Sequence, residues 1–361
     1  MPAATTGAPD AVPPGSKEPA GRPLLPTAVS SDPGEGGQSA WALALAGPGR
    51  LVRIGVPHPS PDRLRAGQVL LRVAAGGICG SDAPFFLGAA NRWAAEGAGP
   101  GSAPGFPLHE VVGEVVASTD PDLAVGQMVV GWASSFDGLA EYVVTDSAGV
   151  WPYGGRLPPE EEVLVQPLAC VLSAVERLGD LAGEDCAVIG QGAIGLLFAH
   201  ALKTRGARWV TTVDRVDRSA AAAHVGVDEF VWAGSGEWSR TVAEDRRPAV
   251  VVEAVGHQTQ TLQHALDVVR ESGRVFYFGV PDDPVYPLDM EAMIRKNLTV
   301  MSGGAVERRR LLLEADAHLR AHPWLVDVLI SHRFAVAQAQ QAFDLAFRSP
   351  GDRLKVVLSM S

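Results

Sequence analysis

The spacing of apolar residues changes along the chain and predicts two kinds of architecture. From Trp41 onward, short apolar runs are broken by Gly and Pro, a pattern that favours many short strands in a compact barrel. These runs are WALALAG, LVRIGV, QVLLRVAAGG, VVGEVVAS, QMVVGWA and LAEYVV. The first large part of the chain is therefore predicted to be a β-barrel domain.

After Pro158 the segments lengthen, and predicted helices alternate with buried strands. Helices are expected from Glu161 to Gly179, after Gly192 and from Arg218. The strands between and after them read CAVIG, WVTTVD, VVVEAV, RVFYFGV and LTVMS. Because such alternation is typical of a parallel, doubly wound sheet, we predict six parallel strands and an α/β fold class for the whole chain.

The composition and charge of the chain limit the kinds of molecule that the protein is expected to bind. Residues 1–38 are rich in Pro, Ala, Gly and Ser, and they are predicted to form a disordered tail. With a formal net charge of −11 spread along the chain, neither nucleic acid nor a membrane is expected as a partner. Three cysteines cannot form a disulfide framework, and no secretory signal is evident, so a cytoplasmic location is expected.

A glycine-rich loop follows the first strand of the predicted sheet. GQGAIG, formed by Gly190, Gln191, Gly192, Ala193, Ile194 and Gly195, lies between that strand and a helix, which is the context a dinucleotide-binding loop requires. The first glycine permits a tight turn, the second lets the pyrophosphate approach, and the third allows close helix packing. FAD would fit the loop alone, but no other feature supports it.

Asp214 ends the next strand and completes this pattern. Its carboxylate would accept hydrogen bonds from the adenosine ribose, which favours NAD over NADP. Arg215 and Arg218 complicate the preference, because a guanidinium there could accommodate a 2′-phosphate. Val255 and Gly279, in VVVEAV and RVFYFGV, are further candidates for contact with the cofactor.

A candidate metal site precedes the loop. Cys79 lies in GGICGSD, and His109 and Glu110 lie in PLHEVVGEVV. A thiolate, an imidazole and a carboxylate are ligand types that Zn²⁺ accepts, and a catalytic zinc uses three protein ligands. Each residue alone has an ordinary structural interpretation, but the three together favour a metal site.

In combination, these motifs resemble the zinc-dependent medium-chain dehydrogenases, the family of alcohol, sorbitol and threonine dehydrogenases. The resemblance also covers GLAEYVV, QPLACVLSAVERLG, LISHRF and LKVVL. It implies a GroES-like catalytic domain over residues 39–172 and 306–361, with a Rossmann NAD-binding domain over 173–305 inserted between them.

The resemblance also implies roles for single residues. Cys79, His109 and Glu110 would be ligands of one catalytic Zn²⁺, and Asp82 would hold the other nitrogen of His109. Ser81 would contact the substrate and relay its hydroxyl proton. The family's second, structural zinc needs four cysteines before the EYVV strand, and the sequence has no cysteine between Cys79 and Cys170, so that zinc is expected to be absent.

Three positions depart from the family pattern. Leu108 replaces a glycine beside His109, and Gln166 replaces a glutamate that can bind zinc, which leaves Gln166, water or Cys170 as candidates for a further ligand. Pro84 replaces a histidine that relays protons, for which His58, His257 and Gln166 are candidate replacements.

These observations predict an enzyme that interconverts a secondary alcohol and its ketone with NAD, most favourably a polyol, sugar or cyclitol. One alternative is a zinc-independent NAD(P)H reductase of the same superfamily, and another is a non-catalytic NAD-binding protein. A homo-oligomer, dimer or tetramer, is expected to form through sheet edges by strands such as RVFYFGV.

Overall fold

The computed structural model describes residues 39–88, 103–154, 157–348, 351 and 353–360. The predicted tail, residues 1–38, lies outside the described residues. Among the described residues, no helix is both long enough and apolar enough to cross a membrane.

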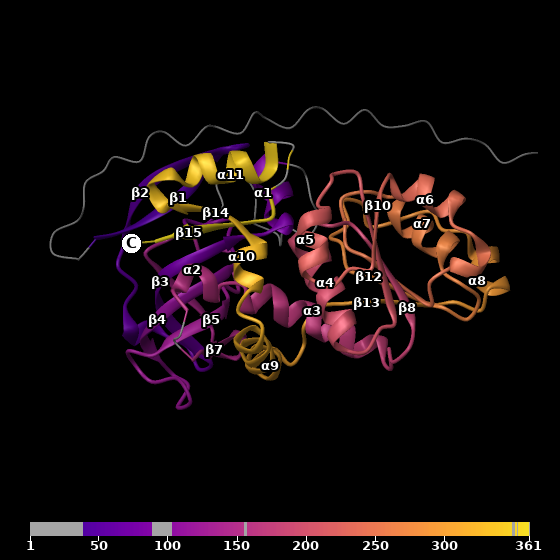
Figure 1. Ribbon diagram of the computed structural model, residues 1–361. Coiled ribbons are helices and arrows are strands. Elements are labelled where there is room, and N and C mark those ends of the chain that lie inside the picture. Colours follow the sequence, from indigo (N-terminus) through magenta and orange to yellow (C-terminus); the bar gives the residue numbers. More distant parts are fainter. Residues whose placement is uncertain (1–38, 89–102, 155–156, 349–350, 352, 361) are drawn as a thin grey trace, which may run out of the picture. The chain divides into compact units, whose positions relative to one another are not determined.

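A six-stranded parallel sheet forms the second half of the fold (Figure 1), which confirms the predicted doubly wound architecture. Its strand order is β10-β9-β8-β11-β12-β13, so the chain starts in the middle and winds outward in both directions. The strands are β8 (Asp185–Ile189), β9 (Trp209–Asp214), β10 (Glu229–Trp232), β11 (Val250–Glu253), β12 (Arg274–Tyr277) and β13 (Thr299–Ser302). The helices between them are α4 (Ala193–Thr204), α5 (Ser219–His224), α6 (Ser235–Thr241), α7 (Thr261–Val268) and α8 (Met290–Arg295).

Both faces of this sheet are covered by helices. In β8, Cys186 and Val188 belong to the core that α4 helps to form, whereas Ala187 and Ile189 belong to the core that contains α7. Figure 1 shows α4 and α5 on one face and α6 and α7 on the other. Burial on both faces explains why these strands read as continuous apolar runs rather than alternating ones.

The remaining strands form a seven-stranded sheet and a separate pair. The larger sheet has the order β14-β15-β3-β4-β5-β7, with β6 paired to β3. Its strands are β3 (Gln68–Ile78), β4 (Glu110–Ser118), β5 (Met128–Trp132), β6 (Tyr142–Asp146), β7 (Val150–Pro152), β14 (Ile330–Ala335) and β15 (Lys355–Ser359); the pair is β1 (Ser39–Gly47) with β2 (Arg50–Pro57).

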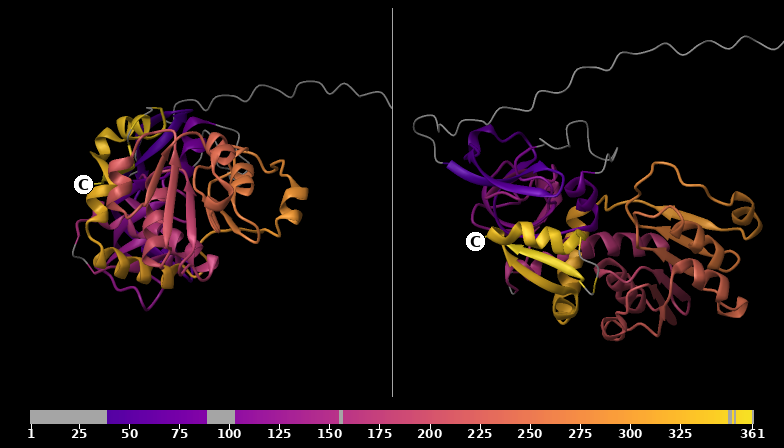
Figure 2. Two further views of the ribbon diagram at one scale, coloured as in Figure 1. Left: turned by 45° about the vertical axis from the view of Figure 1, so that its right-hand side comes forward. Right: turned by 90° about the horizontal axis from the view of Figure 1, so that it is seen from above.

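Strands from early in the chain and from its carboxy-terminal part meet in this larger sheet. The last strand, β15, pairs antiparallel with β3, so that Val356 faces Ile78. Figure 2 shows the yellow carboxy-terminal strands and α11 (Ala339–Arg348) beside the indigo amino-terminal strands. This pairing brings β15 next to the residues that follow β3. The exact domain bounds, 39–172, 173–305 and 306–361, stay a prediction.

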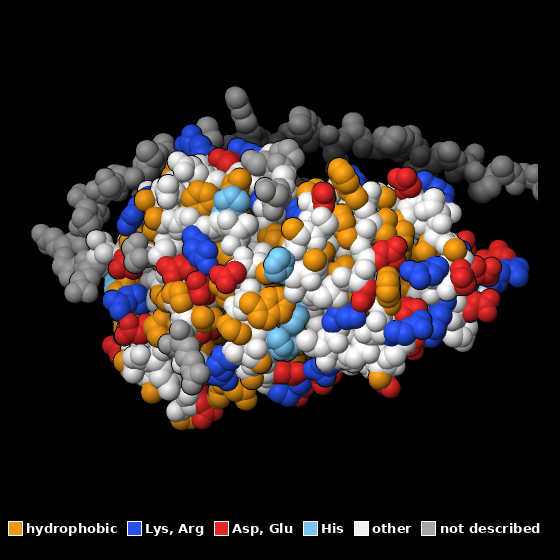
Figure 3. Space-filling view, viewed as in Figure 1, with side chains coloured by type: hydrophobic (Ala, Val, Ile, Leu, Met, Phe, Trp, Pro, Cys, Tyr) orange, Lys and Arg blue, Asp and Glu red, His pale blue; other side chains and the backbone are white. Residues whose placement is uncertain are grey.

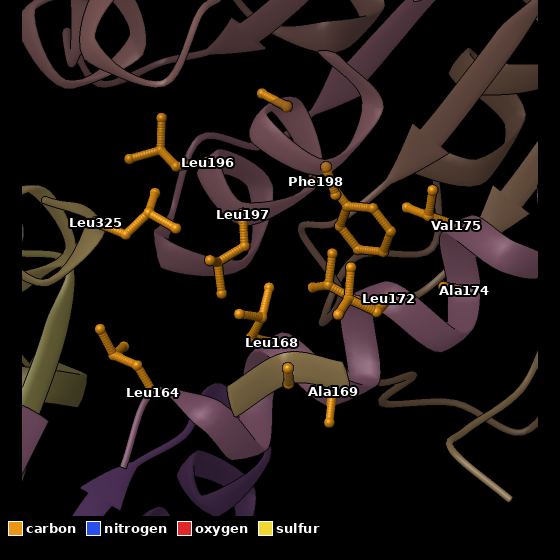
Figure 4. Packing of buried hydrophobic residues seen from close by; sticks show 14 of the residues in the cluster. Leu164, Leu168, Ala169, Leu172, Ala174, Val175, Leu196, Leu197, Phe198 and Leu325 are labelled. Carbon is orange, nitrogen blue, oxygen red and sulfur yellow. The ribbon is translucent and has the colours of Figure 1, made fainter. Parts of the chain in front are cut away.

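One helix packs against both halves of the fold. Helix α3 (Val165–Leu178) shares a core with Val112 and Val130 of the seven-stranded sheet and with α4 of the six-stranded sheet. Figure 4 shows its leucines facing Leu197 and Phe198 of α4. The remaining helices are α1 (Ala83–Leu87), α2 (Pro159–Glu162), α9 (Arg308–Ala321) and α10 (Leu325–Leu329).

Two sequence-based expectations need correction. The single helix expected from Glu161 to Gly179 is divided into α2 and α3 at Val163 and Leu164. Pro167 explains the break, because proline has no N–H and its ring clashes with the carbonyl four residues earlier, that of Val163. The strand RVFYFGV was expected at a sheet edge, but β12 lies between β11 and β13, so that β13 is the edge strand.

Candidate active site

The turn after β3 positions Cys79 and Asp82. The Cys79 N–H donates to Asp82 Oδ2 at 2.9 Å, and the Asp82 N–H donates back to the Cys79 carbonyl at 3.0 Å. These reciprocal bonds close a short 3-10 turn, Gly80–Asp82, in which Asp82 is fully buried. Ser81, in the same turn, is half-buried.

Asp82 also orients His109, which directly precedes β4. Its Oδ1 lies 2.9 Å from His109 Nδ1. Since a carboxylate can only accept, Nδ1 carries a proton, which leaves Nε2 as the nitrogen that can bind a metal once its own proton is released. Burial opposes protonation of His109, but the charges and hydrogen bonds of Asp82 and Cys79 outweigh it and raise its pKa well above 6.5.

Cys79, His109 and Glu110 present donor atoms that all lie within 4.8 Å of one another. His109 and Glu110 are buried, whereas Cys79 is partly accessible. A soft thiolate, an imidazole and a carboxylate form the donor set that a catalytic zinc uses. The structure thus brings together the three residues that the sequence proposed as ligands.

Lys355 is a member of this cluster that the sequence analysis did not identify. Its ammonium group forms an ion pair with Glu110 Oε2, and both residues are buried. Burial lowers the pKa of Lys355, but the charges of Glu110 and Cys79 more than compensate, so its pKa is raised. The only sequence signal is a lysine that opens the otherwise apolar strand KVVLS.

Two buried oxygens near the cluster lack hydrogen-bond partners among the described residues. They are Glu110 Oε1 and Gln166 Oε1. The other end of the Gln166 amide donates to Cys170 Sγ at 3.4 Å. A buried oxygen without a hydrogen-bond partner costs free energy unless a ligand such as a metal ion binds it. These oxygens, together with the thiol and imidazole of the cluster, therefore form a donor set that fits a zinc ion. Burial, and secondarily the charge of Cys79, raises the pKa of Cys170 to about 12, so this thiol is neutral.

The residues that depart from the family pattern have structural explanations. Leu108 is fully buried and occupies the space beside Gly76, where a Cβ would lie 2.3 Å from Leu108 Cδ2. Pro84 is a buried residue of the first turn of α1. Phe136, not identified from the sequence, places its ring centroid 4.8 Å from that of His109.

The histidines considered as proton relays differ in their surroundings. His257 places Nε2 3.2 Å from the Gly80 carbonyl, between Cys79 and Ser81, and its Nδ1 lies 2.6 Å from Asp282 Oδ1. His58 instead bonds the Pro59 carbonyl, and its ring packs on Tyr142. Of these two histidines, His257 is the one that contacts the turn holding Ser81 in the described part of the chain.

The glycine-rich loop between β8 and α4 shows why two of its glycines are required. Gly190 has φ +99°, a conformation that favours glycine. A Cβ on Gly195 would lie 1.9 Å from the Gly190 carbonyl oxygen, so no side chain fits there. A Cβ on Gly192, by contrast, would meet no atom within 4 Å. The loop is therefore tightly packed on one side and open at the start of α4, as a bound pyrophosphate requires.

Asp214 lies at the carboxyl end of β9 and packs against this loop. Its Oδ2 accepts a hydrogen bond from the Gln191 N–H at 2.6 Å. Arg218 lies 3.5 Å from the same oxygen and donates to the carbonyls of Gly351 and Arg353. Arg215 is exposed.

The other cofactor candidates lie at the start of α4 and just after β11 and β12. The Val255 side chain lies beside Gly190, where a Cβ would approach its Cγ2 to 2.9 Å. Gly279 is packed closely against Gly256: a Cβ added to Gly279 would lie 2.3 Å from the backbone nitrogen of Gly256. Ala193 and Ile194 form the first turn of α4.

Two family models match the chain. Residues 65–158 match the alcohol dehydrogenase GroES-like domain, and residues 193–311 match the zinc-binding dehydrogenase model. The first match covers β3 to β7 of the seven-stranded sheet and the second covers β9 to β13 of the six-stranded sheet, and together they confirm the predicted fold class.

Curated relatives and solved structures agree with these matches. D-altritol 5-dehydrogenase of Agrobacterium fabrum is 27% identical and covers 82% of this chain and 93% of the relative. D-arabinitol dehydrogenase 1 of Uromyces fabae is 24% identical and covers 77% of this chain and 86% of the relative. The structure of L-idonate 5-dehydrogenase from Escherichia coli shares the fold, with a TM-score of 0.70, 20% identity, and coverage of 90% of this chain and 99% of that one.

The two family models lie in the expected order along one chain, and the relatives extend over most of it. The protein therefore belongs to the zinc-dependent medium-chain dehydrogenase family, and it is an alcohol dehydrogenase that uses zinc and a nicotinamide cofactor.

Proposed function

We propose that the protein oxidises a secondary alcohol of a polyol, sugar or cyclitol to the ketone, reversibly, with NAD as the hydride acceptor. The observation that carries the site assignment is the cluster of Cys79, His109 and Glu110, whose donor atoms lie within 4.8 Å of one another. The substrate class is supported by relatives named as arabinitol, altritol and idonate dehydrogenases.

Cys79, His109 and Glu110 would hold the zinc, with Gln166 as an alternative further ligand. When bound, zinc supplies a Lewis acid that stabilises negative charge on the substrate oxygen, and the nicotinamide accepts the hydride. Asp82 keeps the proton on His109 Nδ1, so that Nε2 remains available for the metal. The Lys355 ammonium compensates the charge of Glu110 while that carboxylate is buried.

The chain's own residues would move the substrate proton. Ser81, half-buried in the turn between Cys79 and Asp82, would accept the proton of the substrate hydroxyl at Oγ while it passes its own hydroxyl proton on towards solvent. His257 adjoins this turn through the Gly80 carbonyl and is paired with Asp282 near the surface. It is thus the candidate replacement for the relay histidine whose position Pro84 occupies, and it would take up a proton at Nε2 only after giving up the one that it donates to the Gly80 carbonyl.

The preference for NAD is supported by Asp214. A carboxylate at the end of β9 accepts hydrogen bonds from ribose hydroxyls and repels a 2′-phosphate. Arg218 does not offset this, because its guanidinium is already engaged by Asp214 and by two backbone carbonyls. The ratio of kcat/KM for NAD to that for NADP should therefore exceed one.

The test combines metal content with turnover. Zinc per chain is measured by plasma mass spectrometry, and initial rates are measured on a panel of polyols and cyclitols with NAD and NADP. Cys79→Ser and His109→Ala should each lose one zinc and abolish turnover, while NAD affinity changes by no more than a few fold. Cys186→Ala, in the core of β8, serves as the matched control and should retain both properties.

Two results would contradict the proposal. Full turnover by Cys79→Ser would remove this cluster from the chemistry. Wild-type protein that turns over substrate without any zinc would instead support the zinc-independent reductase. Loss of NAD binding in parallel with turnover would indicate that the variant is misfolded, and His109→Gln would then replace it.

A further inference from the structure

Three histidines from two helices converge at a place distant in sequence from the proposed catalytic cluster. His200 lies on α4, while His318 lies on α9 and His322 directly follows α9. The two on α9 are one helical turn apart, so they share one face. His200 is buried, and the other two are half-buried.

The three imidazoles are close enough to share one ligand. Nε2 of His200 lies 3.0 Å from Nε2 of His318. The ring centroid of His322 is 4.7 Å from that of His200 and 4.5 Å from that of His318. One nitrogen of each residue lies within 4.8 Å of those of the other two. Two imidazole nitrogens on a tetrahedral zinc at about 2.1 Å lie roughly 3.4 Å apart, so His200 and His318 already have close to the required separation.

The hydrogen bond of His322 occupies Nδ1 and leaves Nε2 available to bind a metal ion. Its Nδ1 lies 2.9 Å from the carbonyl oxygen of His318. Since a carbonyl can only accept, Nδ1 must carry a proton, and the neutral ring keeps its lone pair on Nε2. A histidine bound to metal through one nitrogen commonly donates its other N–H in this way.

The surroundings keep the rings of His200 and His318 neutral at physiological pH. Burial, and secondarily the charge of neighbouring histidines, lowers the pKa values of His200 and His318 to about 4. Trp324 packs edge-on against His200, with ring centroids 5.2 Å apart. Figure 3 shows histidine side chains gathered near the middle of one face, over the region of α4, α9 and α10 in Figure 1. Neutral imidazoles that converge beside solvent can accept a metal ion.

We propose that His200, His318 and His322 form a second metal site, with three nitrogen ligands, for a divalent transition ion such as Zn²⁺. Three imidazoles without a carboxylate favour Zn²⁺, Ni²⁺, Co²⁺ or Cu²⁺ over Mg²⁺ and Ca²⁺. The ion would connect α4, which covers the six-stranded sheet, to α9. Its role would be structural, because it would restrain two elements that are distant in the chain.

The test measures metal on the full-length chain in which the proposed catalytic cluster has been disabled. Cys79→Ser protein is stripped of metal and titrated with Zn²⁺ or Co²⁺ alone. It should bind one ion per chain, and the Co²⁺ spectrum should lack the thiolate charge-transfer band that the Cys79 cluster would give. Adding His318→Gln and His322→Gln should remove this ion and any thermal stabilisation by Zn²⁺.

His224→Gln in the same Cys79→Ser background is the matched control. His224 lies exposed on α5, where its ring bonds the Ala220 carbonyl, so this variant should retain one ion. Cys79→Ser protein that binds no Zn²⁺, or a double histidine variant that still binds one, would overturn the proposal. If the double variant does not fold, the single variant His322→Gln and the Co²⁺ spectrum of the wild type decide the question.

Discussion

At the scale of single residues, the proposed metal cluster depends on compensation between buried charges. Glu110 is fully buried beside Cys79, and both can be negatively charged, which is unfavourable in a medium of low dielectric constant. Lys355 offsets part of this charge from β15, the last strand of the described chain. The pair therefore links the stability of the fold to the integrity of the site.

Lys355→Met should reveal this link. The substitution removes the ammonium and leaves Glu110 buried without a partner, which typically costs about 3–5 kcal/mol. The free energy of unfolding of the zinc-free protein, measured with urea, should fall by that amount. Adding Glu110→Gln should recover much of the loss, because a neutral amide needs no counter-charge. Equal stability of wild type and Lys355→Met would show that the pair contributes nothing.

Single-residue chemistry was predictable only where it is local in sequence. Cys79 and Asp82 lie in one turn, and the motif GGICGSD indicates both. Lys355 could not be identified, since its partner Glu110 is brought to it by the pairing of β15 with β3 and of β3 with β4. The histidines of α4 and α9 were missed for the same reason, because only the tertiary fold brings them together.

At the scale of elements, the apolar periodicity of the sequence predicted the strands and helices well, whereas it predicted the interruptions of helices less well. Five of the six parallel strands were located in the sequence, because buried strands of a parallel sheet form apolar runs. The sixth, β10, was expected from the fold but not located, since its residues are exposed or only partly buried. The gap between α2 and α3 was missed, although Pro167 marks it. Near this gap, Glu162 at the end of α2 is buried close to Asp316 of α9.

This pair of acids predicts a pH dependence of stability. Burial, and secondarily repulsion by Asp316, raises the pKa of Glu162 from 4.5 to about 7. Between these values the folded state binds more protons than the unfolded state, so the contribution of Glu162 becomes less favourable as pH rises. At about 1.4 kcal/mol per pH unit, the loss approaches roughly 3 kcal/mol by pH 7.

Glu162→Gln should remove that dependence. Relative to wild type, the variant should gain free energy of unfolding between pH 5 and pH 8, measured by urea denaturation at each pH. Glu160→Gln, on the same helix, is the matched control and should track the wild type. A difference between Glu162→Gln and wild type that does not change with pH would show that this carboxyl titrates normally.

At the scale of the whole molecule, the order of strands determines which surface can meet a second copy. A sheet edge cannot be predicted from one strand alone, which is why RVFYFGV was wrongly expected there. On that side of the sheet the edge is β13, which among the described residues pairs only with β12, and the opposite edge is β10. An unpaired edge strand is a template for pairing with another chain.

Exposed apolar side chains flank this edge in sequence. They are Val285, Met290, Ile294 and Val306, with exposed fractions of 77%, 57%, 77% and 89%. Large apolar side chains clustered on a surface indicate a site of association, whereas scattered ones do not. Self-pairing of β13 with β13 of a second copy would bury the edge, and in a C2 dimer the segments next to β13 in sequence would lie beside the same interface on both subunits.

Ile294→Asp should therefore weaken self-association. A carboxylate placed in an apolar interface loses its hydration, and the like charge of the second copy would face it, so the dissociation constant should rise at least tenfold, or about 1.4 kcal/mol. Light scattering coupled to size exclusion, over a range of protein concentrations, measures the change as a shift from dimer or tetramer towards monomer. Val125→Asp is the matched control, since Val125 is 71% exposed between β4 and β5, and it should leave the mass unchanged. A wild type that stays monomeric at micromolar concentration would contradict this prediction. The sheet that carries the dinucleotide loop would then end at β13 in each copy, and the exposed apolar residues would serve another contact.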